Sequence, residues 1–212
     1  MSVTGPGDRR PIAARDWQPV QRFAAWLVRR RASPNGISVA GMVGGVLAGL
    51  CFAAVPEAPG AAWALWLAGA VLVQLRLLAN MMDGMVAVGR GVASPLGELY
   101  NEVPDRVSDT AVLLGAGWAC GQPALGTMAA LAAMATAYVR TVGRASGAGS
   151  DFRGPMAKQQ RMALITAVAV LCAVAPIGWA APAVGAALWV IAVLSLVTAL
   201  RRLMGIARVL RA

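Results

Sequence analysis

Long apolar stretches alternate with short polar or glycine- and proline-containing breaks along most of the chain. Each stretch has about the 20 residues that a helix needs to cross the hydrocarbon core of a bilayer. The pattern predicts six membrane-spanning helices, at roughly 37–55, 61–88, 95–120, 123–145, 158–177 and 180–203. Before the first span, Trp17, Phe23 and Trp26 recur at helical spacing among arginines, which is typical of an amphipathic helix lying on a membrane surface.

Composition narrows the class of protein further. Of the 212 residues, 58% are hydrophobic and 13% are charged, whereas soluble domains carry about 25% charged residues. This excludes a disordered chain and disfavours a soluble globule. The chain has no histidine, and its three cysteines (Cys51, Cys120 and Cys172) are scattered in apolar stretches. Neither histidine catalysis nor a thiolate metal site is therefore expected.

Basic residues predict the orientation of the spans. With the amino terminus inside, all 19 Lys and Arg residues lie at inner ends of spans or on the inner side, whereas the loops at 56–60, 121–123 and 176–182 have none. Because basic residues gather on the cytoplasmic side, both termini are predicted to be cytoplasmic. This also accounts for the net charge of +10 without a nucleic-acid partner. We therefore predict an all-α integral membrane protein, with a basic amphipathic segment over 1–32 and a six-helix transmembrane domain over 33–212.

Polar residues concentrate where the second span ends and the third begins, and such residues in spanning helices are costly and usually functional. They are Arg76, Asn80, Asp83, Glu98, Asn101, Glu102, Asp105, Arg106 and Asp109. Spacings of three and four place them on shared helix faces, and the turn at 89–94 brings both sets to one depth. Oxygen ligands alone favour Mg²⁺ or Mn²⁺, and a hard cation at this place suggests phosphate chemistry. The alternative is ion pairing between helices, for instance Arg106 with Glu102 or Asp109.

A family resemblance lies in the same stretch. Residues 80–105, NMMDGMVAVGRGVASPLGELYNEVPD, resemble the signature D-x2-D-G-x2-A-R-x8-G-x3-D-x3-D of the CDP-alcohol phosphotransferases. The matching positions are Asp83, Gly84, Ala87, Gly97 and Asp105. Asn80, Val88 and Asn101 replace the expected Asp, Arg and Asp. Six spans, an amphipathic amino-terminal helix and a Ser-Pro-Asn sequence before the first span also look like this family.

The resemblance implies a membrane phosphotransferase in phospholipid biosynthesis. It would move a phosphatidyl group from a CDP-linked lipid, CDP-diacylglycerol in particular, to a small alcohol or phospho-alcohol and release CMP. One or two Mg²⁺ or Mn²⁺ ions are implied, and by position Asp83, Asp105, Asn80 and Asn101 would hold them. Asp105 would also act as the base. Gly84, Ala87 and Gly97 would lie against the nucleotide. The implied setting is a bacterial inner membrane, with membrane lipids as partners, a homodimer as the assembly, and the active site facing the cytoplasm.

The departures from the signature leave three interpretations open. Where the family has four carboxylates this chain has two, so Glu98, Glu102 and Asp109 are the candidates for additional ligands. The protein is then an active enzyme with a rearranged site, a one-metal enzyme, or a catalytically impaired relative. The last would bind CDP-lipid or metal and act as a regulator or scaffold. A transporter is disfavoured because the acids gather at one membrane surface and not at the midplane.

Two further patterns carry predictions. Basic residues at the inner ends of the fourth and fifth spans are expected to bind the phosphate of the acceptor or of the lipid; ordinary cytoplasmic flanking is the alternative. They are Arg140, Arg144, Arg153, Lys158 and Arg161. Glycines at 41, 44, 45 and 49 predict close helix packing, with protomer contact as one option. The terminal arginines, Arg202 among them, are predicted to anchor the chain at the membrane surface.

Overall fold

The computed structural model describes residues 13–92 and 95–211, and these residues form helices and connecting loops without a strand. The elements are η2 (Ala13–Asp16), α1 (Gln18–Arg29), α2 (Pro34–Ala53), η3 (Pro59–Ala61), α3 (Ala62–Gly89), α4 (Pro95–Ala119), α5 (Pro123–Ala145), α6 (Lys158–Val174), η4 (Ile177–Trp179) and α7 (Ala180–Val209). The all-α prediction is confirmed. Each predicted span corresponds to one helix, and the largest difference is that α7 continues beyond residue 203 to Val209.

Four segments are long and apolar enough to cross a membrane, namely α2, residues 59–89 with α3, α5 and α7. The helix α4 falls short because its first fifteen residues include five charged ones, and α6 has 17 residues. Four of the six predicted spans are thus helices with the length and composition that crossing a membrane requires. The count of six spans and the orientation of the termini stay predictions.

Local sequence signals explain where the helices begin and end. Pro34 is the first residue of α2, and the Ser33 hydroxyl accepts a hydrogen bond from the Gly36 amide at 3.2 Å. This is the cap that a Ser-Pro pair predicts, since it satisfies one of the unpaired amides of the first turn. Gly121 follows α4 with φ of +69°, a left-handed conformation that favours glycine after a helix.

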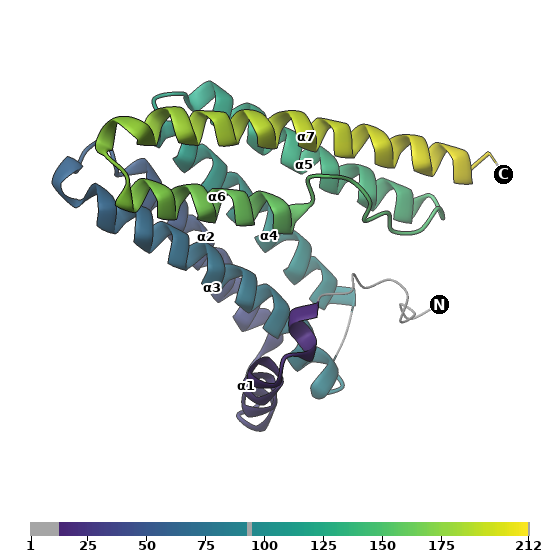
Figure 1. The fold of residues 1–212 in the computed structure, drawn as a ribbon. Helices are drawn as coiled ribbons and strands as arrows, with labels where there is room; N and C mark the ends of the chain where they lie inside the picture. The colour runs from purple at the N-terminus through teal and green to yellow at the C-terminus, as the bar shows by residue number, and fades with distance from the viewer. Residues whose placement is uncertain (1–12, 93–94, 212) are drawn as a thin grey trace.

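The helices form a bundle with two distinct ends (Figure 1). The connections after α2, α4 and α6 lie together at one end, and the 146–157 loop, the carboxyl terminus and α1 lie away from them. The helix α2 packs against both α3 and α4, α5 packs against α4 and α7, and α6 packs against α3 and α7. Phe52 and Trp66 pack against each other in the buried core, with ring centroids 5.2 Å apart and ring planes tilted by 39°.

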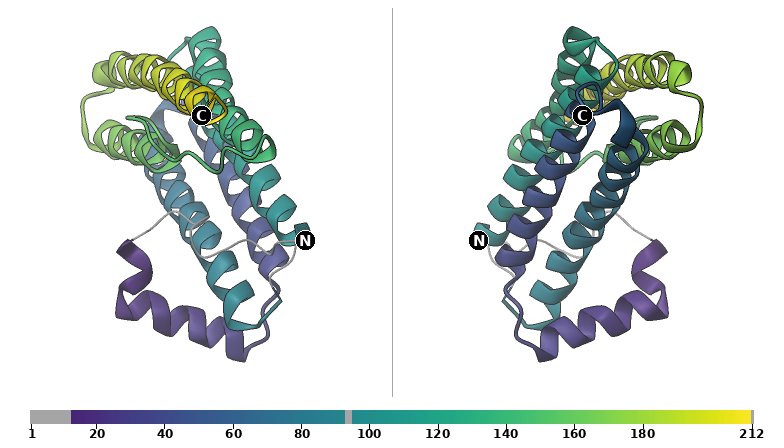
Figure 2. Two further views of the ribbon diagram at one scale, coloured as in Figure 1. Left: turned by 90° about the vertical axis from the view of Figure 1, so that its right-hand side faces the viewer. Right: turned by 90° about the vertical axis from the view of Figure 1, so that its left-hand side faces the viewer.

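The helix α1 lies across one end of the bundle, at a steep angle to the long helices (Figure 2). Its Val20 and Ala24 are buried against Met81 and Met82 of α3, whereas Trp17 and other aromatic side chains are exposed. One face therefore packs on the protein and another stays apolar and open, as the amphipathic pattern predicts.

The glycines of α2 serve packing within the chain. A Cβ atom added to Gly49 would overlap the backbone of Ala111 in α4, and one on Gly115 would overlap the backbone of Gly49. Gly45 meets Ser108 of α4 and Gly41 meets Ala79 of α3 in the same way. These glycines allow α2 to approach its neighbours closely, so they do not constitute a face for a second protomer. The homodimer stays a prediction on other grounds.

Candidate functional site at the ends of α3 and α4

The side chains at the four positions where the signature has aspartate, 80, 83, 101 and 105, meet around one small cavity. The cavity has a volume of about 10 Å³ and is lined from α2, α3 and α4. The Asn80 side-chain amide donates to Asn101 Oδ1 at 2.6 Å and to Asp105 Oδ1 at 2.9 Å. Asp83 lies on the same cavity, one helical turn along α3. The predicted meeting of the two helices at one depth is confirmed, with α2 forming one wall.

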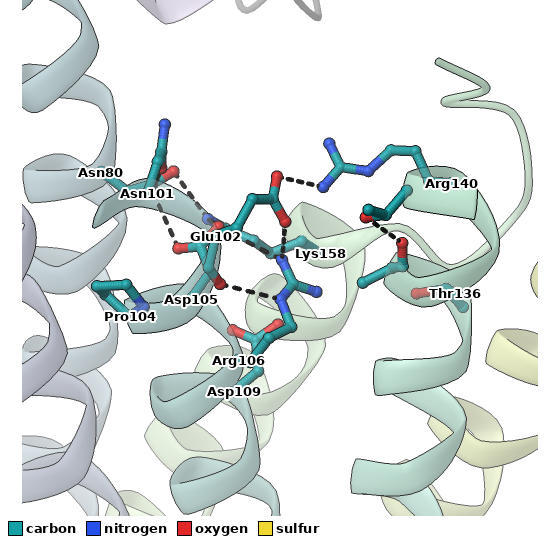
Figure 3. A network of polar contacts seen from close by, with 12 residues as sticks. Asn80, Asn101, Glu102, Pro104, Asp105, Arg106, Asp109, Thr136, Arg140 and Lys158 are labelled. Atoms are coloured by element: carbon teal, nitrogen blue, oxygen red, sulfur yellow. Dashed lines mark hydrogen bonds and ion pairs between the residues drawn. The ribbon is translucent and has the colours of Figure 1, made fainter. Parts of the chain in front are cut away.

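Both carboxylate oxygens of Asp105 bind cationic or amide groups (Figure 3). Asp105 Oδ1 accepts from Asn80 and from Arg76 Nη2, the latter at 3.0 Å. Asp105 Oδ2 binds the Lys158 ammonium and lies 3.6 Å from Arg106 Nη2. The carboxylate is buried, so these groups replace the water that would otherwise stabilise its charge.

Lys158 connects α6 to this site. It is the first residue of α6, and its side chain is 15% exposed. Its Nζ atom donates to Asn80 Oδ1 at 2.7 Å and to Asp105 Oδ2. The ammonium group therefore bridges the first and last signature positions, because α6 packs against α3.

Asp83 has one satisfied and one unsatisfied oxygen. Its Oδ2 accepts a hydrogen bond from the Ser38 hydroxyl at 2.6 Å. Its Oδ1 is buried without a hydrogen-bond partner among the described residues, and the same holds for Arg76 Nη1. Both residues line the small cavity, which is about the size that holds one water molecule.

A second carboxylate lies deeper, between two arginines. Asp109 is 2.7 Å from Arg76 Nη2 and 3.3 Å from Arg161 Nη2. Arg161 is 1% exposed and also donates to Thr136 Oγ1 at 3.3 Å and to the Met156 carbonyl at 2.9 Å. These contacts join α3, α4, α5 and α6 around one buried charge. We call Arg76, Asp83, Asp105, Asp109, Lys158 and Arg161 the inner cluster; it has three acidic and three basic side chains.

A more exposed group of charges lies beside the inner cluster. Glu102 pairs with Arg106 at 3.5 Å and with Arg140 of α5 (Figure 3). The Arg140 guanidinium also lies over the Phe152 ring, 5.5 Å from its centroid. The expected ion pair of Arg106 with Glu102 is therefore present. Asp109 instead pairs with Arg76 and Arg161.

The five basic residues predicted to bind phosphate do not gather in one patch. Lys158 and Arg140 reach the signature region, as described above. Arg161 is buried on Asp109 and does not face a ligand. Arg153 lies on the loop before α6, 76% exposed, and pairs with Asp151 at 2.8 Å. Arg144 is half-buried on α5.

The positions predicted to lie against a nucleotide are placed as follows. A Cβ atom added to Gly84 would meet nothing within 4 Å, so open space adjoins α3 there. Ala87 and Gly97 are half-buried. Val88 is exposed, and Arg90 donates to the carbonyls of residues 31 and 32, which ties α3 to the start of α2. The side chain of Glu98 lies outside the part of the chain that the structure describes.

The prediction for Arg202 is wrong. It is 4% exposed, and its guanidinium donates to the carbonyls of Arg153 and Thr136, both at 2.9 Å. It thus holds the 146–157 loop and α5 to α7 instead of anchoring the chain at the membrane surface. The sequence has no signal for this role, because its partners are backbone carbonyls. Ser38 was also missed as a partner of Asp83.

The side chains as arranged do not fit a pair of divalent cations. Among the described residues, no three Asp, Glu, Cys or His side chains lie together as a metal-binding group. The oxygens of Asp105 and the carbonyl oxygen of Asn80 bind protein cations, which leaves Asp83 Oδ1 as the open carboxylate oxygen of this set. Mg²⁺ takes about six oxygen ligands and Ca²⁺ six to eight.

Comparisons with known proteins give one kind of match. No family model matches the chain, and no curated protein does. Structures of phosphatidylinositol phosphate synthase from Mycobacterium tuberculosis are similar. The complex with manganese and citrate has a TM-score of 0.75 at 23% identity, covering 89% of this chain and 88% of that one. The complex with CDP-DAG has a TM-score of 0.75 at 23% identity, covering 90% and 94%. The apo form has a TM-score of 0.71 at 23% identity, covering 88% and 95%.

These similarities establish the fold. Phosphatidylinositol phosphate synthase is a CDP-alcohol phosphotransferase, so the fold implied by the sequence resemblance is confirmed. The likeness extends over nearly the whole chain, and not only over the 26 residues of the signature stretch. The shared fold does not establish an activity, a donor, an acceptor or a metal for this chain. These depend on its own side chains.

Proposed function

We propose that this protein is a membrane phosphotransferase that moves a phosphatidyl group from a CDP-linked lipid to an alcohol and releases CMP. One observation carries the proposal. Asn80, Asp83, Asn101 and Asp105, which match or replace the signature residues, surround one cavity in a fold shared with an enzyme whose structure holds CDP-DAG. We propose CDP-diacylglycerol as the donor, and a bacterial inner membrane with a cytoplasmic site as the setting.

The charges beside the cavity suit a pyrophosphate. Lys158, Arg106 and Arg140 bring three cations to this region, and Glu102 is the exposed acid among them. Arginine binds phosphate through parallel hydrogen bonds and lysine binds it as a point charge. The open space beside Gly84 leaves room for a flat group such as the cytosine base. Arg140, held beside Phe152, is a candidate for the phosphate of a phospho-alcohol acceptor.

Asp105 is the candidate base. Its Oδ1 is held by Arg76 and Asn80, whereas its Oδ2 binds Lys158, the flexible partner. In the proposed step the ammonium turns towards the donor phosphates and Oδ2 takes the proton of the acceptor hydroxyl. The acceptor oxygen forms a bond to the phosphatidyl phosphorus, the bond from that phosphorus to the CMP oxygen breaks, and CMP leaves with the electron pair.

A second function is favoured by the same contacts. Both oxygens of Asp105 are already occupied by cationic side chains, and two of the four positions where the signature has aspartate are asparagine. This arrangement suits a protein that binds CDP-lipid without turning it over and that regulates or supports a partner. The two functions make opposite predictions for CMP release.

CMP release by the purified protein separates them. The protein in detergent would be given CDP-diacylglycerol with glycerol 3-phosphate, inositol, inositol phosphate or serine, with and without Mn²⁺. For an enzyme we expect CMP release with one acceptor and a loss of about 10²-fold or more in Asp105→Asn. Asp151→Asn is the matched control, because this aspartate lies on the loop before α6. Absence of CMP with every acceptor, while CDP-diacylglycerol still raises the melting temperature, would establish the binding protein instead.

A further inference from the structure

We propose that the ammonium group of Lys158 is the resident cation of this site. It stands between positions 80 and 105, where two oxygens would otherwise hold a divalent ion, so that the site binds its nucleotide ligand without a divalent cation. The identity of that ligand rests on the proposed function. The prediction about metal does not, because it concerns binding and needs no turnover.

Geometry is the first argument. Lys158 Nζ lies 2.7 Å from Asn80 Oδ1 and also contacts Asp105 Oδ2. These atoms belong to the first and last positions of the signature, and each directs a lone pair at the ammonium. A metal ion reaches both oxygens only if Lys158 leaves. The backbone of Lys158 is fixed as the first residue of α6, and its ammonium is held by these two contacts when no ligand is bound.

Charge is the second argument. The inner cluster has three acidic and three basic side chains, so it is neutral without any added ion. A divalent cation added beside Lys158 would leave this buried region with an excess charge of about +2, and one that displaced Lys158 would still leave about +1; uncompensated buried charge is strongly destabilising. Aspartate at positions 80 and 101 would add two negative charges, which is what one divalent cation neutralises. Both positions are asparagine here.

The open oxygen of Asp83 is the remaining place for a metal, and its surroundings disfavour one. Asp83 Oδ1 and Arg76 Nη1 are both buried without a hydrogen-bond partner among the described residues, and both residues line the same cavity of about 10 Å³. The cavity has about the volume of one water molecule, and a water is able to donate to a carboxylate and to accept from a guanidinium. A divalent cation in the same space would face the charge of Arg76.

Manganese binding tests the proposal directly. The purified full chain in detergent, stripped with EDTA, would be titrated with Mn²⁺ while free Mn²⁺ is measured by electron paramagnetic resonance. We expect no saturable binding and no change in melting temperature. We also expect CDP to bind with the same Kd in Mn²⁺ and in EDTA. Saturable Mn²⁺ binding by the unaltered protein that Asp83→Asn or Asp105→Asn abolishes would overturn the proposal, and so would loss of CDP binding in EDTA.

A gain of metal binding sharpens the test. A variant with Asn80→Asp, Asn101→Asp and Lys158→Gln removes the ammonium and adds two carboxylates. We expect it to bind Mn²⁺ saturably over a concentration range in which the unaltered chain shows no saturable binding, because ligand charge sets the affinity of hard-cation sites. Lys158→Arg keeps the cation and should gain nothing. Arg153→Gln removes a loop charge outside the site and controls for net charge.

The outcomes separate failure of this proposal from failure of the proposed function. A triple variant that folds, by gel filtration, and gains no Mn²⁺ binding would contradict the replacement of a metal by Lys158. If the triple variant does not fold, the titration of the unaltered chain decides alone. Absence of CMP release leaves the Mn²⁺ result intact, and Mn²⁺ binding by the unaltered chain overturns only the present proposal.

Discussion

The inner cluster and the Asp151–Arg153 pair use the same kinds of charged side chain, but the cations of the inner cluster are buried and Arg153 is exposed. In the inner cluster each carboxylate of Asp105 and Asp109 is shared by at least two cations, and all are largely removed from solvent. Asp151, whose side chain is 10% exposed, pairs with one neighbour two residues away, and that neighbour, Arg153, is 76% exposed. Water already solvates the Arg153 guanidinium, so its removal costs less than removal of a cation that is itself buried. The contribution of an ion pair to the stability of this protein therefore depends on how deeply its charges are buried and on how many partners share each charge.

The largest effect is expected for Arg161→Met. The substitution keeps most of the buried volume but removes one of the two cations on Asp109 and leaves Thr136 and the Met156 carbonyl without this donor. Breaking a buried pair by removing one partner costs about 3–5 kcal/mol. Unfolding in detergent titrated with sodium dodecyl sulphate would measure the loss. Arg153→Met is the control, and an equal loss in both variants would remove the distinction between the two regions.

A smaller effect is expected for Arg202→Met. Its guanidinium donates to two backbone carbonyls, so the substitution removes these two hydrogen bonds. Unsatisfied buried acceptors cost about 1–3 kcal/mol. Arg201→Met is the matched control, because the preceding arginine is exposed. An unfolding midpoint for Arg202→Met equal to that of Arg201→Met would show that the hydrogen bonds from Arg202 to the two carbonyls do not contribute to stability.

Local signals let the sequence predict most of the helices. Ser33 and Pro34, or Gly121 and Pro123, mark the ends of apolar stretches, and such signals act within a few residues. The meeting of Asn80 with Asn101 and Asp105 was also predictable, because spacings of three and four and one short turn determine it.

Partners far apart in the chain were not predictable. Lys158 reaches Asn80 across 78 residues, which depends on α6 packing against α3, and no local pattern specifies that pairing. Neighbouring arginines 201 and 202 differ in burial: Arg202 is buried and donates to carbonyls of α5 and the loop, whereas Arg201 is exposed. The glycines of α2 predicted close packing correctly, but their sequence does not say whether α4 or a second protomer fills the space.

An intermediate case between the two regions is Arg140, whose partner Glu102 is partly exposed. We expect Arg140→Gln to lower the free energy of unfolding by no more than about 1 kcal/mol. The loss should shrink further at high salt, since screening weakens solvent-accessible pairs. Unfolding midpoints at low and high NaCl would measure this. A loss of stability that does not change with salt would show that the pair of Arg140 and Glu102 behaves like the buried pairs of the inner cluster. Under the proposed function, Arg140→Gln should also slow CMP release with a phosphorylated acceptor by a larger factor than its small loss of stability accounts for.

The smallest effect is expected at Asp151, and it should depend on pH. The side-chain hydrogen bond from Arg153 lowers the pKa of Asp151 below its ordinary value. A carboxyl whose pKa is lower in the folded than in the unfolded state contributes stability that is complete above its unfolded pKa of about 3.9, and that is lost as the pH falls through the folded value. The unaltered chain should therefore melt slightly above Asp151→Asn at pH 7, and this gap should close as the pH falls below about 4. Melting curves of both proteins over that range would measure the gap. A gap that persists in acid would mean that Asp151 acts through packing or hydrogen bonds that survive protonation, and not through its charge.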